Sequence, residues 1–262
     1  MRIATWNVNS VLARLPRLVE WLEQAAPDVV CLQETKVADD AFPADEVAAL
    51  GYSVAHHGEG RWNGVAVLSR VGLTDVVPGL PGDPGFPTAQ TLEARTVAAT
   101  CGGVRVRSVY VPNGRAPDDP HYAYKLRWLG ALREAVADDA AGALPFAVMG
   151  DFNVAPTDAD VWDPAAFVGS THVTQSERSA LAELRAVGLS DLQPRIAKGV
   201  PYTYWDYRAG SFHSVFRASI QGSSGPSGSS RMPPGPTASG RPPRVEAITG
   251  MPLICASVAT RP

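Results

Sequence analysis

The chain has few cysteines, little excess charge and no long apolar run. Cys31, Cys101 and Cys255 are far apart and show no CxxC spacing, which excludes a disulfide framework and a thiolate zinc site and favours a reducing compartment. The formal net charge of -3 excludes a globally basic surface, so nucleic acid would have to be met by a local patch or by metal ions. No run is long enough to span a membrane, and the first residues lack the apolar core of a signal peptide. We therefore expect a cytoplasmic protein without a membrane partner.

Strands and helices alternate along a chain of ordinary composition. Its 262 residues are 45% hydrophobic and 19% charged, which suits one large α/β domain or two small ones. An apolar stripe through Leu15, Leu18, Val19 and Leu22 follows Ser10 and predicts a capped helix. Apolar runs predict strands at 3–8, 28–32, 65–69 and 145–149. The pattern predicts an α/β layered domain.

Three further segments carry local signals. Strand-like runs at 96–101 and 104–111 flank Gly102-Gly103 and predict a hairpin. Residues 121–137 predict a helix with Lys125, Arg127 and Arg133 available to solvent, and Thr174-Gln175-Ser176-Glu177 has the capping-box spacing that opens another helix. Residues 78–87 are rich in proline and glycine and predict a loop.

The stretch Gly150-Asp151-Phe152-Asn153 follows a predicted buried strand. If the chain stays extended, residues i and i+2 point to the same face, so Asp151 and Asn153 would aim at one spot. The carboxylate could take a proton or hold a metal, while the amide donates hydrogen bonds to a developing negative charge. The alternative is an Asx turn without chemistry, since Gly, Asp and Asn favour turns for backbone reasons alone.

Similar polar residues follow the other predicted strands. Asn7, Glu34 and Tyr110 each stand at the carboxyl end of a strand, as Asp151 does. Open α/β sheets build their sites at such ends. The sequence therefore predicts one site formed by separate strand ends.

The composition changes after Arg208. Residues 221–244 contain 17 Gly, Pro or Ser among 24, and no aspartate follows Asp206. Such a segment cannot bury enough apolar surface to offset the ordering of the chain, so we expect residues 213–262 to be an atypical, irregular tail. Arg, Gly, Pro, Ser and Ala are what GC-rich codons encode out of frame, and this favours a reading-frame disruption over a natural flexible tail.

Six stretches occur in an order that resembles the exodeoxyribonuclease III family of endonuclease/exonuclease/phosphatase-fold enzymes. They cover residues 1 to about 212 and include both Gly150-Asp151-Phe152-Asn153 and the aromatic run 202–208. The other four are Ile3-Ala4-Thr5-Trp6-Asn7-Val8-Asn9-Ser10, Leu32-Gln33-Glu34-Thr35-Lys36, Asn63-Gly64-Val65-Ala66-Val67 and Tyr110-Val111-Pro112-Asn113-Gly114.

The resemblance implies a four-layered α/β sandwich, with two mixed sheets face to face and helices outside. It implies cleavage of duplex DNA beside abasic sites and stepwise removal of 3′ nucleotides, with Mg²⁺ or Mn²⁺ as cofactor. The catalytic domain would then span 1–212, incomplete at its end. We expect a monomer.

The resemblance assigns roles to the strand-end residues. Glu34 would ligate the metal, with Asn7 orienting it or touching the metal shell, and Asp151 would orient or deprotonate water and could touch the metal. Asn153 would bind a phosphate oxygen and Tyr110 would donate its phenol to the phosphate. The alternatives are a surface glutamate paired with Lys36, turn capping by Asn7 and a half-buried strand tyrosine.

DNA contacts are expected at five further residues. Arg14 and Lys125 would contact phosphates without regard to sequence, although lone basic residues are as often merely solvated. Trp205 and Tyr207, with Arg208, would stack on a deoxyribose or base, and the alternative is a role in the core. The five histidines show no metal-ligand spacing.

The chain departs from the family's pattern at its end. The family carries a Gly-x-Arg-Ile-Asp motif and a terminal Ser-Asp-His motif, whereas no aspartate follows Asp206 here and the last histidine is His213. Losing that Asp–His pair would cost several powers of ten in rate. We therefore expect feeble activity and poor solubility. A vestigial DNA-binding protein, or a phosphatase or phosphodiesterase of the same fold, stays an alternative.

Overall fold

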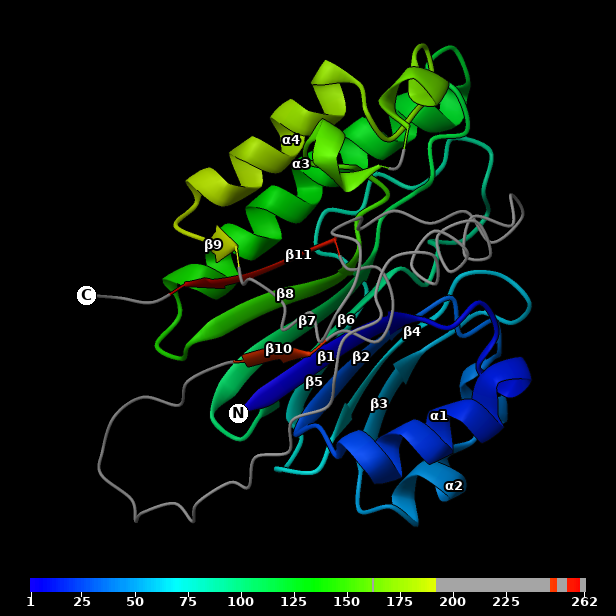
Figure 1. Cartoon of the computed structure of the whole chain (residues 1–262), viewed down its shortest axis with the longest axis vertical. Coiled ribbons are helices and arrows are strands. Elements are labelled where there is room, and N and C mark those ends of the chain that lie inside the picture. Colours follow the sequence, from blue (N-terminus) through cyan, green and yellow to red (C-terminus); the bar gives the residue numbers. More distant parts are fainter. Residues whose placement is uncertain (162, 192–245, 249–253, 260–262) are drawn as a thin grey trace, which may run out of the picture.

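A computed structural model describes residues 1–161, 163–191, 246–248 and 254–259. Two β-sheets lie face to face, and helices cover their outer surfaces (Figure 1). The predicted α/β fold with two mixed sheets is confirmed. The predicted boundary between a catalytic domain and a tail at 212/213 falls outside the described residues and stays a prediction.

The first sheet has the strand order β10-β1-β2-β4-β3. β1 pairs in parallel with both β10 and β2, while β4 runs antiparallel to β2 and β3, so the sheet is mixed. Its strands are β1 (Arg2–Asn7), β2 (Val29–Gln33), β3 (Ser53–His57), β4 (Val65–Ser69) and β10 (Glu246–Ile248).

The second sheet has the strand order β5-β6-β7-β8-β11-β9. Among its described strands, only β7 and β8 pair in parallel, and the other pairs are antiparallel. Its strands are β5 (Thr74–Pro78), β6 (Thr96–Cys101), β7 (Val104–Tyr110), β8 (Phe146–Asp151), β9 (Ser190–Asp191) and β11 (Ile254–Ala259).

Helices lie on the two outer faces of this pair of sheets (Figure 1). α1 and α2 cover the first sheet, and α3 and α4 cover the second. The α-helices are α1 (Val11–Ala25), α2 (Ala44–Ala48), α3 (Pro120–Ala141) and α4 (Gln175–Ala186), and short 3₁₀ turns occur at Asp39–Ala41, Asp158–Asp160 and Pro164–Phe167.

The strand sequences explain why the sheets are covered on both sides. Neighbouring residues of a strand point to opposite faces. In β2, Val29 and Cys31 pack in the core between the sheets, whereas Val30 and Leu32 pack with α1 and α2. In β8, the side chain of Phe146 instead packs with α3 and α4. A strand that is apolar at consecutive positions therefore requires a partner on each face, which gives four layers.

Several local predictions are confirmed. β4 has the predicted bounds, and β6 and β7 form the predicted antiparallel hairpin around Gly102-Gly103. Ser10 accepts a hydrogen bond from the Ala13 amide at the start of α1, and the capping box between Thr174 and Glu177 is formed at the start of α4. Each of these signals depends on residues only a few positions apart.

The sequence pattern did not indicate β3 and β5. β5 is exposed along its whole length, so its residues show no alternation of apolar and polar side chains. Within the predicted irregular tail, residues 246–248 and 254–259 are strands, and β11 lies between β8 and β9.

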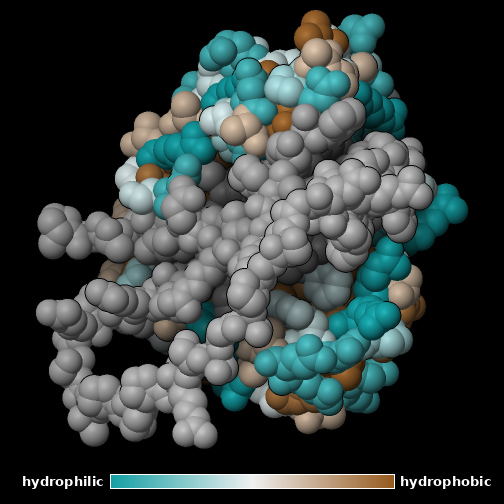
Figure 2. All heavy atoms as spheres, viewed as in Figure 1, coloured by the Kyte–Doolittle hydropathy of each residue, from teal (hydrophilic) through white to brown (hydrophobic). Residues whose placement is uncertain are grey.

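Where residues are described, the face in Figure 2 is mainly hydrophilic over the helices at both ends, with scattered hydrophobic positions. Among the described helices, none has both the length and the apolarity that a bilayer span requires.

Candidate active site

Two pairs of parallel strands, one in each sheet, supply the candidate site. Asn7 and Gln33 are register partners at the carboxyl ends of β1 and β2, and Glu34 follows directly. Tyr110 and Asp151 are register partners at the carboxyl ends of β7 and β8. Because parallel strands end at the same edge, each pair presents its polar residues together.

The side chain of Asn7 joins the two pairs. Its Nδ2 donates to Glu34 Oε1 at 2.7 Å and to Asp151 Oδ2 at 2.9 Å. One amide group therefore lies within hydrogen-bond distance of two carboxylates that come from different sheets. The structure brings Asn7, Glu34 and Asp151 to one point.

Tyr110 pairs in register with Asp151, and the charges of Glu34 and Asp151 both act on its phenol. Burial, and then the charges of Glu34 and Asp151, hold the pKa of Tyr110 well above its ordinary value. Arg95 lies over the ring, with its guanidinium carbon 5.0 Å from the ring centroid. The phenol therefore stays protonated near neutral pH and can act as a hydrogen-bond donor.

Burial is also the main influence on Asp151 and raises the pKa of its carboxyl group. The charge of Glu34 acts in the same direction, whereas the hydrogen bonds from Asn7 and from the Asn153 amide oppose the change. A carboxylate with a raised pKa is a better proton acceptor than a solvated one.

Asn153 reaches the site through a turn rather than an extended strand. β8 ends at Asp151, whose Oδ1 accepts a hydrogen bond from the Asn153 backbone N at 2.9 Å. Asn153 has φ of 50°, so the expectation that both side chains share a strand face is wrong. The Asx turn offered as the alternative is present, and the same turn places Asn153 beside the site.

The orientation of the Asn153 amide is determined by its buried neighbours. Its Nδ2 donates to Val111 O at 2.8 Å, and its Oδ1 accepts from Asn113 Nδ2 at 3.4 Å and lies 3.2 Å from His172 Nε2. Only 5% of Asn153 is exposed. The amide is therefore held in one orientation.

Left-handed backbone conformations are concentrated at this site. Glu34, Lys36 and His172 have φ of 53°, 55° and 81°, in addition to Asn153. Such conformations cost free energy and persist where the surroundings hold them. Hydrogen bonds from Ser10 N to Glu34 O at 2.7 Å and from Lys36 N to Asn63 O at 3.0 Å hold the Glu34 turn.

A glycine allows β8 to lie close to β7 beside the site. A Cβ atom added to Gly150 would lie 1.9 Å from Val109 O. Any side chain there would separate β7 from β8 and move Tyr110 away from Asp151.

Comparison with known proteins shows what this chain resembles. Residues 4–236 match the Endonuclease/Exonuclease/phosphatase family. The chain belongs to this family. Exodeoxyribonuclease III of Haemophilus influenzae is 28% identical over 224 residues, which are 81% of this chain and 82% of that protein. The resemblance to the exodeoxyribonuclease III family is confirmed.

Two solved structures share the fold. A structure of the 3′ phosphatase NExo from Neisseria, bound to a product DNA hairpin, is 39% identical with a TM-score of 0.74. An AP endonuclease from Archaeoglobus fulgidus is 33% identical with a TM-score of 0.72. Each match covers 81% of this chain and 81% of the other.

Members of the endonuclease/exonuclease/phosphatase family are divalent-metal-dependent, and the donor atoms here fit such an ion. No cluster of three or more His, Cys, Asp or Glu side chains suited to a metal occurs among the described residues. Glu34 and Asp151 nevertheless supply two carboxylates within reach of one amide. Mg²⁺ takes oxygen ligands and is commonly bound by one or two carboxylates with water.

The structure corrects the expectation for Lys125. We expected this side chain to be exposed and to contact DNA phosphates, but it is fully buried, and its Nζ lies 2.5 Å from Glu177 Oε1. Lys125 is three and four residues before Trp128 and Leu129, so it lies on the buried stripe of α3. The helical period, rather than the charge, decided its position, and a phosphate outside the protein cannot reach it.

The structure leaves the other predicted DNA contacts open. Arg14 lies near the start of α1 and is half-buried, close to the Glu34 turn because Val11 N donates to Thr35 O at 2.9 Å. Trp205, Tyr207 and Arg208 lie outside the described residues. Contacts of all four with DNA stay predictions.

Sequence reasoning missed two residues of this candidate site, Asn113 and His172. Asn113 Nδ2 lies 3.2 Å from His172 Nε2, and both side chains face Asn153. Asn113 belongs to a stretch that carried the resemblance, so a signal was present. His172 had none, because its place depends on contacts with residues far away in the chain.

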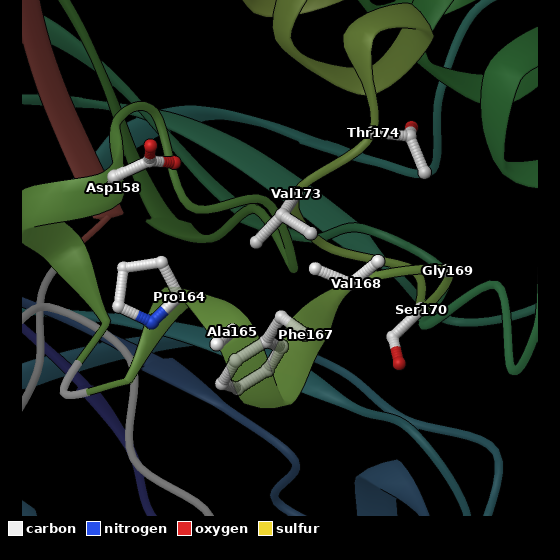
Figure 3. A pocket seen from close by; sticks show the side chains of 9 residues that line it. All are labelled: Asp158, Pro164, Ala165, Phe167, Val168, Gly169, Ser170, Val173 and Thr174. Atoms are coloured by element: carbon white, nitrogen blue, oxygen red, sulfur yellow. The ribbon is translucent and has the colours of Figure 1, made fainter.

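A cavity of about 400 Å³ lies apart from these residues (Figure 3). Its wall includes Pro164, Phe167, Val168 and Val173, with Asp158 and Thr174 at the sides. None of the predicted site residues lines it. The candidate site at the strand ends and this cavity are therefore separate features of the described residues.

Proposed function

We propose that the protein is a divalent-metal-dependent DNA phosphodiester hydrolase. It would act as a 3′–5′ exodeoxyribonuclease and abasic-site endonuclease in base-excision repair. The observation that carries the proposal is the bridge from Asn7 Nδ2 to the carboxylates of Glu34 and Asp151. Family membership, a relative named exodeoxyribonuclease III and a structure named AP endonuclease support it.

The residues of the site divide the reaction among them. Asp151 would orient an attacking water and accept its proton, which the raised pKa of its carboxyl group favours. Tyr110, which stays protonated, would donate a hydrogen bond to a phosphate oxygen as negative charge develops. Asn153 would bind a second phosphate oxygen.

Glu34, with Asn7 and Asp151, would hold Mg²⁺ or Mn²⁺. Such an ion neutralises the charge that develops on the phosphate and lowers the pKa of bound water. Arg14 would bind DNA phosphates, and Trp205, Tyr207 and Arg208 would contact an opened sugar or base. We further propose that the protein acts as a monomer in the cytoplasm.

Purified protein incubated with abasic-site duplex DNA tests the proposal. Strand incision with Mg²⁺ or Mn²⁺, abolished by EDTA and by the substitution Asp151→Asn, supports it. Complete lack of DNA cleavage with either metal would overturn it. We expect a low rate, because the chain lacks the family's C-terminal Asp and His motifs. Robust incision would contradict that expectation.

A second candidate activity is the hydrolysis of a 3′-phosphate, because the 39%-identical structural relative is described as a 3′ phosphatase. Duplex DNA with a 3′-phosphate end would release inorganic phosphate if this site hydrolyses terminal phosphate esters. Faster phosphate release than abasic-site incision would favour this phosphomonoesterase function.

A further inference from the structure

The buried ammonium of Lys125 is bonded to the backbone of the candidate site. Its Nζ donates to Asn153 O at 2.6 Å and to Asn113 O at 3.2 Å. These two carbonyls belong to different loops, one after β8 and one after β7. A single cation therefore joins the two loops whose asparagines meet beside the carboxylates.

Glu177 completes this arrangement from α4. Its Oε1 accepts from Thr171 Oγ1 at 2.6 Å and from His172 N at 2.9 Å, and its Oε2 accepts from Thr174 N at 3.1 Å. His172 has a left-handed backbone, so its position needs support. The carboxylate of Glu177 supplies that support through Oε1, the same oxygen that accepts from Lys125.

Neither charge is exposed to water. The side chains of Lys125 and Glu177 are both 0% exposed. Burial would raise the pKa of Glu177, but the ammonium of Lys125 and the hydrogen bonds to Glu177 bring it below its ordinary value. Burial lowers the pKa of Lys125, while the charge of Glu177 and the hydrogen bond to it act in the opposite direction. Each member of the pair therefore favours the charged form of the other.

We propose that Lys125 and Glu177 are positioning residues for the reaction, which set the orientation of the Asn153 and Asn113 amides. This inference rests on the proposed function. Lys125 holds the turn at Asn153 by donating to the backbone carbonyl oxygen of Asn153. In this turn, Asn153 Nδ2 donates to Val111 O, and Asn153 Oδ1 faces Asn113 and His172. Loss of the pair would rotate or loosen these amides even in a folded protein.

A purely stabilising role is the competing explanation, and the chain offers a matched control for it. Arg133 on α3 and Glu183 on α4 form an ion pair at 2.8 Å between the same two helices. Their side chains are 41% and 59% exposed, and they do not contact the site. Any effect of linking α3 to α4 by charge should be seen in both pairs.

The test compares the double variants Lys125→Met/Glu177→Gln and Arg133→Met/Glu183→Gln with the unchanged full chain. Replacing both members of a buried pair leaves no uncompensated charge, so the first double variant should fold. Thermal melting curves are measured before the assay, and the assay temperature is chosen so that all three proteins are folded. We expect the turnover number on abasic-site DNA to fall about 10- to 100-fold in the first double variant, as for the loss of outer-shell partners, with KM little changed. The surface control should keep its turnover number.

A second readout does not depend on cleavage. The side-chain amide resonances of Asn153 and Asn113 in ¹⁵N-labelled protein should shift in the Lys125→Met/Glu177→Gln variant and stay in place in the control. If the unchanged protein cleaves no DNA, the proposed function fails, and these resonances still test the positioning role. Unshifted Asn resonances, or a turnover number within about twofold of the unchanged protein, would overturn the inference.

Discussion

Two lysine–glutamate pairs of this protein have the same chemistry and opposite surroundings. Lys36 Nζ lies 2.8 Å from Glu34 Oε2, and these side chains are 26% and 20% exposed. Lys125 Nζ lies 2.5 Å from Glu177 Oε1, and neither side chain is exposed. Both glutamates lie near the candidate site, one at a strand end and one at the start of a helix.

The difference shows what each pair can do. Water and ions can reach the first pair, so Lys36 can leave Glu34 and a metal ion can take its place. The second pair is shielded, and removing one partner would leave a buried charge without compensation. Partial exposure therefore suits Glu34 for chemistry, whereas burial suits Glu177 for holding the backbone.

Replacing the lysine of each pair should give the largest difference in stability between the buried pair and the exposed pair. Lys125→Met should lower the free energy of unfolding by about 3–5 kcal/mol, because the Glu177 charge stays buried. Lys36→Met should lower it by about 1 kcal/mol or less, because Glu34 remains hydrated. Urea unfolding measures both, and equal losses in the two variants would contradict the contrast.

The glutamates should show the reverse order in activity. Glu34→Gln should lower the turnover number on DNA about a hundredfold or more, since the metal and its several kcal/mol of charge stabilisation are lost. The free energy of unfolding should change by less than about 1 kcal/mol. Metal-dependent cleavage assays and urea unfolding of one preparation test this prediction, and undiminished cleavage would exclude Glu34 as a metal ligand.

Acid should weaken the buried pair. The Lys125 charge and the hydrogen bonds hold the pKa of Glu177 below its unfolded value, despite burial. Its stabilising contribution is therefore complete above the ordinary pKa of glutamate and is lost as the pH falls through the lower, folded pKa. The stability difference between the unchanged protein and Glu177→Gln should shrink in that acid range. A difference independent of pH down to the point of unfolding would contradict this assignment.

The smallest effect is expected at the surface pair between α3 and α4. Arg133→Met should change the free energy of unfolding by about 0.2–1 kcal/mol, because both partners are hydrated. The remaining effect should decrease with added salt. A loss as large as that of Lys125→Met would remove the distinction between exposed and buried pairs in this protein.

Sequence reasoning was most successful where the signal lay within a few residues, or where polar residues directly followed a predicted strand. The hairpin around Gly102-Gly103 and the bounds of β4 followed from turn residues and continuous apolar runs. Asn7, Glu34, Tyr110 and Asp151 were each recognised at a strand end, and the structure brings them together. Their catalytic roles stay predictions.

Other features could not be predicted in this way. β5 has no alternating pattern, because both of its faces are exposed. Lys125 was expected at the surface from its charge, yet it lies on the buried stripe of α3. His172 contacts Asn113 and Asn153 across 59 and 19 positions of the chain, so no spacing in the sequence indicated it.

The side chain of Glu177 has one contact that the sequence determined and another that only the tertiary structure decided. The sequence by itself determined its capping bond, because Thr174 and Glu177 are three residues apart and the first turn of a helix brings them together. Only the tertiary structure decided its pairing with Lys125, 52 positions away, and the loss of all contact with water. A local hydrogen bond depends on backbone geometry over a few residues. Burial of Glu177 depends instead on the packing of α3 against α4, and no single stretch of sequence determines the contacts between two helices.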